Sequence, residues 1–179
     1  EKAIKLEKDA LAQIENITAD NARLVSNLHA NLGGLYRMNG HPDLAREHME
    51  KSISLLDQFN LLHINDSIPQ IANYAMFLTE QQEPERGISE LQKLSGIIKE
   101  YHSDDCLDYA KVQENLGTIY LMTANLPQAK THFKKAFKIY EKIWADEPEM
   151  IEAKYQEIQE LYPQIGFCIG KNLSGLLTK

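Results

Sequence analysis

The fold is decided by the stretch Ala30-Asn31-Leu32-Gly33-Gly34-Leu35-Tyr36, because it returns twice along the chain. It returns as Ala72-Asn73-Tyr74-Ala75-Met76-Phe77-Leu78 and again as Glu114-Asn115-Leu116-Gly117-Thr118-Ile119-Tyr120. The differences 73 − 31 and 115 − 73 are both 42 residues, and no gap is needed. Self-similarity at a fixed period of this length indicates a repeat protein, in which each unit buries its apolar face by stacking on its neighbours.

Each 42-residue unit has the pattern of two helices joined by a turn. Leu28 and Leu32 begin a series of apolar residues at the spacing of one helical face. A break follows at Asn39-Gly40-His41-Pro42, and proline is favoured in the first turn of a helix, where its missing N–H is not needed. Pro84 and Pro127 repeat this feature, so we expect a second helix to begin near each of these prolines.

Two columns of small residues indicate where the paired helices touch. The columns are Gly33, Ala75 and Gly117 in the first helix, and Ala45, Gly87 and Ala129 in the second. Glycine inside a helix costs about 1 kcal/mol relative to alanine, so close packing of the two helices is the expected compensation.

The whole pattern resembles the tetratricopeptide repeat: a large apolar residue, Gly or Ala, two residues, Tyr, a turn, and a second helix with regularly placed small residues. The common unit has about 34 residues. The 42-residue unit with Asn-Leu-Gly/Ala looks like a long-helix subclass that includes kinesin light chains, the Pins/LGN scaffolds and bacterial peptide-pheromone regulators. The resemblance covers about residues 1–145. It implies an all-α fold, a right-handed superhelical solenoid of antiparallel helix pairs.

We expect one domain over residues 1–179, built from successive units. Residues 1–20 hold the second helix of a truncated repeat, residues 21–62, 63–104 and 105–146 form three repeats, and residues 147–179 form degenerate capping helices. Pro163 should separate a helix at 148–162 from a last apolar helix that includes Phe167 and Leu177. The chain begins without methionine inside a helical pattern, which indicates an excerpt of a longer protein. The terminal helices could pair between two copies as a homodimer.

Charge and composition argue against several classes of partner. The formal net charge is −7, whereas nucleic-acid binders carry basic stripes and proteins that dock on anionic membranes carry basic clusters. No stretch approaches the roughly 20 apolar residues of a membrane span. Cys106 and Cys168 are the only cysteines, too few for a disulfide scaffold, and we expect reduced thiols in the cytoplasm.

The asparagine column is the sharpest functional feature. Asparagine is a poor helix former, so nothing in the core pattern calls for Asn31, Asn73 and Asn115. The resemblance implies that this position lines the concave groove, where a carboxamide offers a peptide backbone both a donor and an acceptor. The alternative is that these side chains bond neighbouring helices and only fix the solenoid.

Other residues of the first helices should share that face. One turn away from the asparagines lie Asn27, Lys111, Met76 and Thr118, and further along lie Arg37, Met38 and Met122. The methionines could give an adaptable apolar floor or be ordinary core residues. Arg37 and Lys111 could bind carboxylates or could simply be solvated. A full carboxylate clamp repeated in successive units is absent from the sequence.

Histidines and carboxylates form no recognisable catalytic or metal-binding set. We expect the six histidines not to cluster, and His48 and His132, at equivalent positions, to be exposed. His29 could touch the groove. No HExxH spacing occurs, and the carboxylates lie on polar helix faces, so we expect no enzyme activity, no metal and no cofactor.

The sequence therefore predicts a scaffold or adaptor that binds a segment of another protein or a peptide in the concave groove. The alternative is a peptide-sensing regulatory domain of a larger bacterial signalling or transcription-regulating protein. An enzyme or a nucleic-acid-binding repeat fits the sequence poorly.

Overall fold

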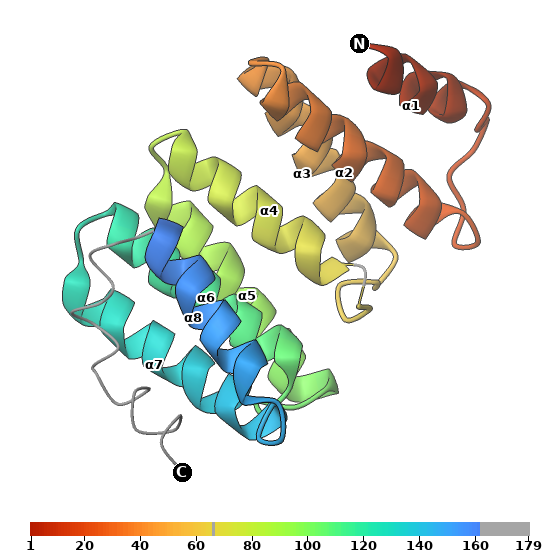
Figure 1. Cartoon of the computed structure of the whole chain (residues 1–179). Coiled ribbons are helices and arrows are strands. Elements are labelled where there is room, and N and C mark those ends of the chain that lie inside the picture. Colours follow the sequence, from red (N-terminus) through yellow and green to blue (C-terminus); the bar gives the residue numbers. More distant parts are fainter. Residues whose placement is uncertain (66, 162–179) are drawn as a thin grey trace. The chain divides into compact units, whose positions relative to one another are not determined.

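The computed structural model describes residues 1–65 and 67–161, which form helices and no strand (Figure 1). Along the chain these helices are α1 (Lys2–Ala12), α2 (Ala22–Met38), α3 (Pro42–Gln58), α4 (Ser67–Glu80), α5 (Pro84–Tyr101), α6 (Leu107–Met122), α7 (Leu126–Ile143) and α8 (Pro148–Leu161). They divide into two compact units, one covering Glu1–Glu90 and the other beginning at Leu91. The boundary falls inside α5.

The second helix of each repeat begins where the proline pattern predicts. Helices α3, α5 and α7 start at residues 42, 84 and 126, and each has a proline in its first turn. Before α7, the side chain of Asn125 accepts a hydrogen bond from the backbone N–H of Gln128 at 3.3 Å. This cap satisfies one of the amides that a helix N-terminus leaves without a partner.

The turn before each of these helices uses the same backbone conformation. Gly40, Gln82 and Ala124, again 42 residues apart, have φ angles of 75°, 65° and 58°. Only glycine adopts such angles without a steric cost. The geometry of the turn is therefore kept even where the sequence has no glycine.

Small residues bring the two helices of a pair close together, as predicted. A Cβ on Gly33 would lie 2.6 Å from Met49 Cγ, and one on Gly117 would lie 2.9 Å from the ring of Phe133. A Cβ on Gly87 would lie 2.5 Å from the backbone oxygen of Ala75. No real Cβ tolerates such contacts, so these positions accept only glycine without movement.

Each unit has its own core. In the first unit it is built around Leu32, Tyr36, Met49, Phe77 and Leu78, and Ile4 and Leu11 of α1 pack against it. In the second unit the large, fully buried side chains include Leu116, Ile119, Phe133 and Tyr140. The apolar helical stripes read from the sequence are thus the buried ones.

At the two ends of the described residues, α1 spans Lys2–Ala12 and α8 begins at Pro148. The predicted last apolar helix after Pro163, and with it Cys168, lies outside the described residues. Cys106 carries a free thiol, whose sulfur accepts from the N–H of Tyr109 at the start of α6. Within residues 1–65 and 67–161, no helix has the length and apolar character needed to cross a bilayer.

Candidate functional site

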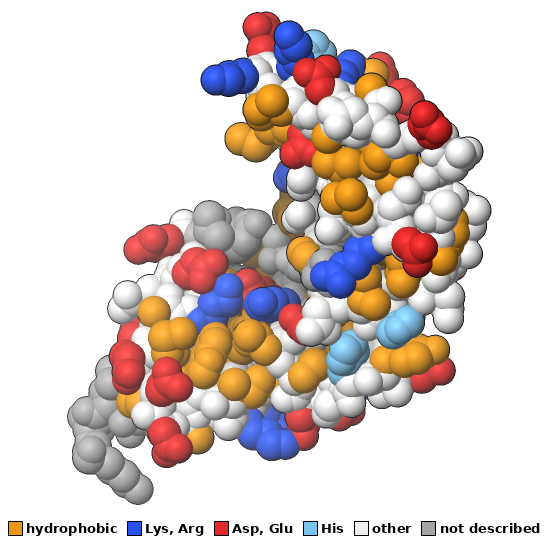
Figure 2. Space-filling model, turned by 90° about the vertical axis from the view of Figure 1, so that its right-hand side faces the viewer, with side chains coloured by type: hydrophobic (Ala, Val, Ile, Leu, Met, Phe, Trp, Pro, Cys, Tyr) orange, Lys and Arg blue, Asp and Glu red, His pale blue; other side chains and the backbone are white. Residues whose placement is uncertain are grey.

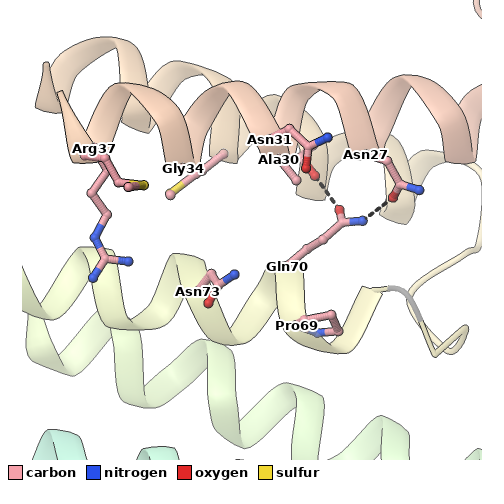
Figure 3. A pocket seen from close by; sticks show the side chains of 11 residues that line it. Asn27, Ala30, Asn31, Gly34, Arg37, Pro69, Gln70 and Asn73 are labelled. Atoms are coloured by element: carbon pink, nitrogen blue, oxygen red, sulfur yellow. Dashed lines mark hydrogen bonds between the residues drawn. The ribbon is translucent and has the colours of Figure 1, made fainter. Parts of the chain in front are cut away.

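A groove of about 520 Å³ lies between α2 and α4 in the first unit, and α3 contributes to its floor (Figure 3). Helix α2 supplies Asn27, Ala30, Asn31, Gly34, Arg37 and Met38, helix α3 supplies Met49 and Ser52, and helix α4 supplies Pro69, Gln70 and Asn73. The 42-residue register puts residues 31 and 73 at equivalent places on two neighbouring first helices. Their side chains therefore reach the same groove.

The groove brings together half of the residues that the sequence singled out. Those that line it are Asn27, Asn31, Arg37, Met38 and Asn73. Met76 lies half-buried on α4 and is not part of the lining. Lys111, Asn115, Thr118 and Met122 belong to α6 in the second unit. Thr118 is buried, Asn115 is half-buried and Met122 is exposed.

A buried polar cluster lies under the groove, and sequence reasoning did not identify it. Ser52 Oγ donates to Gln70 Oε1 at 2.6 Å, and Ser26 Oγ lies 2.9 Å from the same oxygen. Gln70 Nε2 then donates to Asn27 Oδ1 at 2.5 Å, the bond drawn between α4 and α2 in Figure 3. Both serines are almost completely buried, so these bonds are shielded from competing water. In this arrangement Gln70 Oε1 accepts within the cluster and Gln70 Nε2 faces Asn27.

The sequence contains a signal for this cluster at positions 26 and 52, when they are compared with the equivalent positions of the later repeats. Position 26 is occupied by Ile68 and Ala110 in the later repeats, and position 52 by Leu94 and Ala136. A serine in an otherwise apolar column is a buried polar group that needs a partner. That partner comes from the next first helix, at a position where the other repeats carry no amide.

The remaining groove asparagines are held differently. Asn31 Nδ2 donates to Glu7 Oε1 of α1 at 3.1 Å. The carboxamide of Asn73 is exposed and has no hydrogen-bond partner among the described residues. Both asparagines therefore keep hydrogen-bonding capacity on the groove side.

The charged and methionine positions differ from the simplest expectation. Arg37 is not a solitary cation, because its guanidinium binds both carboxylate oxygens of Glu80, with Nε at 2.8 Å from Oε2. Met38 stands at the rim with 84% of its surface exposed. The apolar floor comes instead from the buried Met49 on α3.

A smaller pocket, of about 280 Å³, lies in the second unit between α6, α7 and α8. Its lining consists of Leu107, Lys111, Tyr140, Trp144, Met150, Ala153, Lys154 and Glu157. Lys154 Nζ lies 3.0 Å from both Glu114 Oε1 and Glu157 Oε2. Burial lowers the pKa of Lys154, but the two carboxylates outweigh burial and raise it overall.

The two pockets occupy equivalent places in the repeat. Adding 84 to Asn27, Pro69, Gln70 and Asn73 gives Lys111, Ala153, Lys154 and Glu157. Three of the four amide-bearing positions of the first pocket, Asn27, Gln70 and Asn73, are therefore charged in the second. The two pockets share a backbone arrangement and differ in chemistry.

The expectation that His48 and His132 are exposed is wrong. Both are half-buried, and their rings stack on Tyr36 and Tyr120 with centroids 5.4 and 5.3 Å apart. Each occupies the second helix of its repeat and faces the tyrosine of the first helix. The sequence did not indicate this burial, because a histidine flanked by Glu and Lys is usually expected on a solvent-exposed helix face.

The histidines also do not all stand apart. His29 Nδ1 lies 2.9 Å from His48 Nδ1, so one ring donates and the other accepts. In the equivalent place of the second unit, His132 Nδ1 donates to Gln113 Oε1 at 2.9 Å. Burial, and then the nearby His48, lower the pKa of His29 to about 4. Burial, and then Lys135, do the same for His132. Among the described residues, no three His, Cys, Asp or Glu side chains converge as metal ligands.

Charges on the face of the molecule drawn in Figure 2 are mixed. In Figure 2 acidic and basic side chains alternate over the visible face, and neither sign forms a continuous stripe among the described residues. Among the described residues that line the groove, Arg37 is the one Lys or Arg, and it is paired with Glu80. The groove thus offers mainly amide and apolar contacts.

Comparison with known proteins supports the pattern read from the sequence. Residues 67–142 match the family model of the tetratricopeptide repeat. Among solved structures, the crystal structure of BtubC (BKLC) from P. vanneervenii is similar, with a TM-score of 0.76 and 18% sequence identity. The match covers 98% of this chain and 73% of that chain. No curated protein sequence matches significantly.

These matches bear on the fold and on the general role of the repeats. The predicted fold class, all-α helix pairs of a tetratricopeptide-type solenoid, is confirmed. The family match supports tetratricopeptide repeats in this chain, and such repeats generally mediate protein–protein interactions. The 18% identity to BtubC carries the fold alone.

Proposed function

We propose that the chain is a protein-interaction scaffold that holds an extended segment of a partner protein in the groove between α2 and α4. The observation that carries this proposal is the convergence of Asn27, Asn31 and Asn73 from two helices on one groove. Carboxamides can bond a peptide backbone whatever side chains it carries. The groove is therefore suited to the main chain of an extended segment.

The chemistry of the lining favours a partner segment of low charge. The only cation of the lining is satisfied by Glu80, and the floor is made by Met49 and the buried Ser52. Binding that depends on charge weakens steeply with salt, whereas binding through amides and apolar contact does not. We expect partner affinity to change little with ionic strength.

Selection of displayed random peptides on the full chain tests the proposal. Peptides recovered from several rounds are then measured against wild type, against an Asn27/Asn31/Asn73 triple alanine variant, and against Asn16→Ala as a control. Asn16 is exposed and lies in the loop before α2, outside the groove. Each groove alanine should weaken binding on the order of tenfold, since a lost hydrogen bond is worth about 1 kcal/mol or more.

The possible outcomes are distinct. Peptides that bind wild type and Asn16→Ala but not the triple variant support the groove. Peptides that bind all three proteins equally would place the binding surface elsewhere and overturn the proposal. Circular dichroism of the triple variant checks that its helices remain intact.

A further inference from the structure

The groove asparagines on α2 are held in opposite orientations by residues outside that helix. Asn27 is held through its oxygen, because Gln70 Nε2 donates to Asn27 Oδ1 at 2.5 Å. Asn31 is held through its nitrogen, because Asn31 Nδ2 donates to Glu7 Oε1 at 3.1 Å. The two amides therefore leave opposite groups available.

The orientation of the Asn27 amide is linked to the buried cluster of Ser26, Ser52 and Gln70. Ser52 Oγ donates to Gln70 Oε1 and Ser26 Oγ lies 2.9 Å from the same oxygen, and Gln70 Nε2 faces α2. A primary amide carries its donor and its acceptor at the two ends of one planar group. With Oδ1 bound, Asn27 Nδ2 is turned away from Gln70, as Figure 3 shows.

The orientation of the Asn31 amide follows from Glu7 alone, because a deprotonated carboxylate can only accept hydrogen bonds. Glu7 Oε1 accepts a hydrogen bond from Asn31 Nδ2, and Asn31 Oδ1 remains available as an acceptor. The other oxygen, Glu7 Oε2, is buried and has no hydrogen-bond partner among the described residues. Glu7 therefore lies half-buried in the contact between α1 and α2.

We propose that Gln70 and Glu7 set the hydrogen-bond polarity of the groove, with Asn27 as a donor that binds a partner carbonyl and Asn31 as an acceptor that binds a partner N–H. This rests on the proposed function and adds the direction in which a peptide backbone is read. Residues 27 and 31 are separated by about 6 Å along the helix axis. An extended strand presents both the N–H and the C=O of every second residue along one edge, so a donor and an acceptor on α2 can bind unlike groups of the same edge.

The orientation is tested first on the full chain without any partner, by NMR with ¹⁵N-labelled asparagine and glutamine. The decisive variant is Gln70→Glu, which keeps the shape and still accepts from both serines but can no longer donate. Asn27 must then turn its nitrogen toward α4. Gln58→Glu is the matched control, because Gln58 is exposed on α3 and adds the same charge outside the groove.

In wild type, the Asn27 side-chain amide protons should exchange with solvent as fast as those of an exposed amide. In Gln70→Glu, one of them should move downfield and exchange on the order of tenfold more slowly, as one added hydrogen bond requires. In Glu7→Ala, protection of the Asn31 amide protons should be lost. An Asn27 amide that is protected in wild type, or unchanged in Gln70→Glu, would overturn the proposal.

The second arm uses a peptide from the selection above. Gln70→Glu should weaken its binding on the order of tenfold or more, while Gln58→Glu leaves binding unchanged. If the amide turns but affinity stays the same, the partner does not read the polarity and the proposal fails. Because the NMR arm needs no peptide, failure of the groove as a binding site and failure of the amide orientation are separate results.

Discussion

Gly87→Ala should destabilise the chain even though alanine is the better helix former. The new Cβ would lie 2.5 Å from the backbone oxygen of Ala75 and 2.9 Å from Thr79 Oγ1. Thr79 Oγ1 donates to that same oxygen at 3.0 Å, so the two neighbours are tied to each other. Helix α5 must therefore move away from α4 by roughly 1 Å to restore an ordinary contact.

The magnitude follows from two opposing terms. Replacing a helical glycine by alanine gains about 1 kcal/mol of propensity. Overpacking a close contact costs about 1–3 kcal/mol, and a value of about 2–3 kcal/mol applies here because the obstacle is backbone, which cannot rotate away. We expect a net loss of about 1–2 kcal/mol, or a melting temperature lower by about 2–8 °C for a chain of this size.

Gly96→Ala in the same helix supplies the control. Gly96 is exposed, and a Cβ there meets nothing within 4 Å. This variant should keep the propensity gain and raise the melting temperature by about 2–4 °C. Thermal unfolding followed by circular dichroism measures both. A Gly87→Ala protein as stable as wild type would refute the close-contact argument.

Two further predictions concern the second unit. Because the pKa of His132 is about 4 in the folded chain and about 6.5 when unfolded, the unfolded state binds more protons between these pH values. Stability is therefore fully present above about pH 6.5 and declines toward pH 4. After allowance for solvent screening at this half-buried site, His132 accounts for about 1–2 kcal/mol of the decline. Urea denaturation at pH 7 and pH 5 should show a smaller pH dependence in His132→Gln, and an unchanged dependence contradicts the assignment. Tyr140→Phe removes the hydroxyl that donates to Glu114 Oε2 at 2.6 Å, so urea denaturation at pH 7 should show a loss of about 1.5–3 kcal/mol. A Tyr140→Phe chain with the stability of wild type would show that the bond adds nothing.

The helices could be predicted because the same residue pattern occurs in three successive repeats. The prolines that begin α3 and α5, the small residues at Gly33 and Gly117, and the apolar stripes each follow from local chemistry that recurs every 42 residues. Because the three repeats agree position by position, the helix assignment did not depend on the pattern of any single stretch. The fold class followed from that agreement.

The site was predictable only where the repeat itself placed the residues. Asn31 and Asn73 share a column, and the structure puts both in one groove. Gln70 and Glu7 are not repeated at the equivalent positions of the other units, and their role comes from contacts between different helices that a one-dimensional pattern does not contain. The half-burial of His132 has the same origin, because its cover is a ring on the preceding helix.

The 84-residue correspondence between the amide-lined groove and the charged pocket has an engineering consequence. The four positions concerned lie outside the small-residue columns that hold the helix pairs together. Lys111, Lys154 and Glu157 can be transplanted onto positions 27, 70 and 73 if Ser26 and Ser52, which lose the acceptor on Gln70, are replaced by alanine, as at Ala110 and Ala136 of the second unit. The chemistry of the groove can thus be changed at defined positions of the repeat.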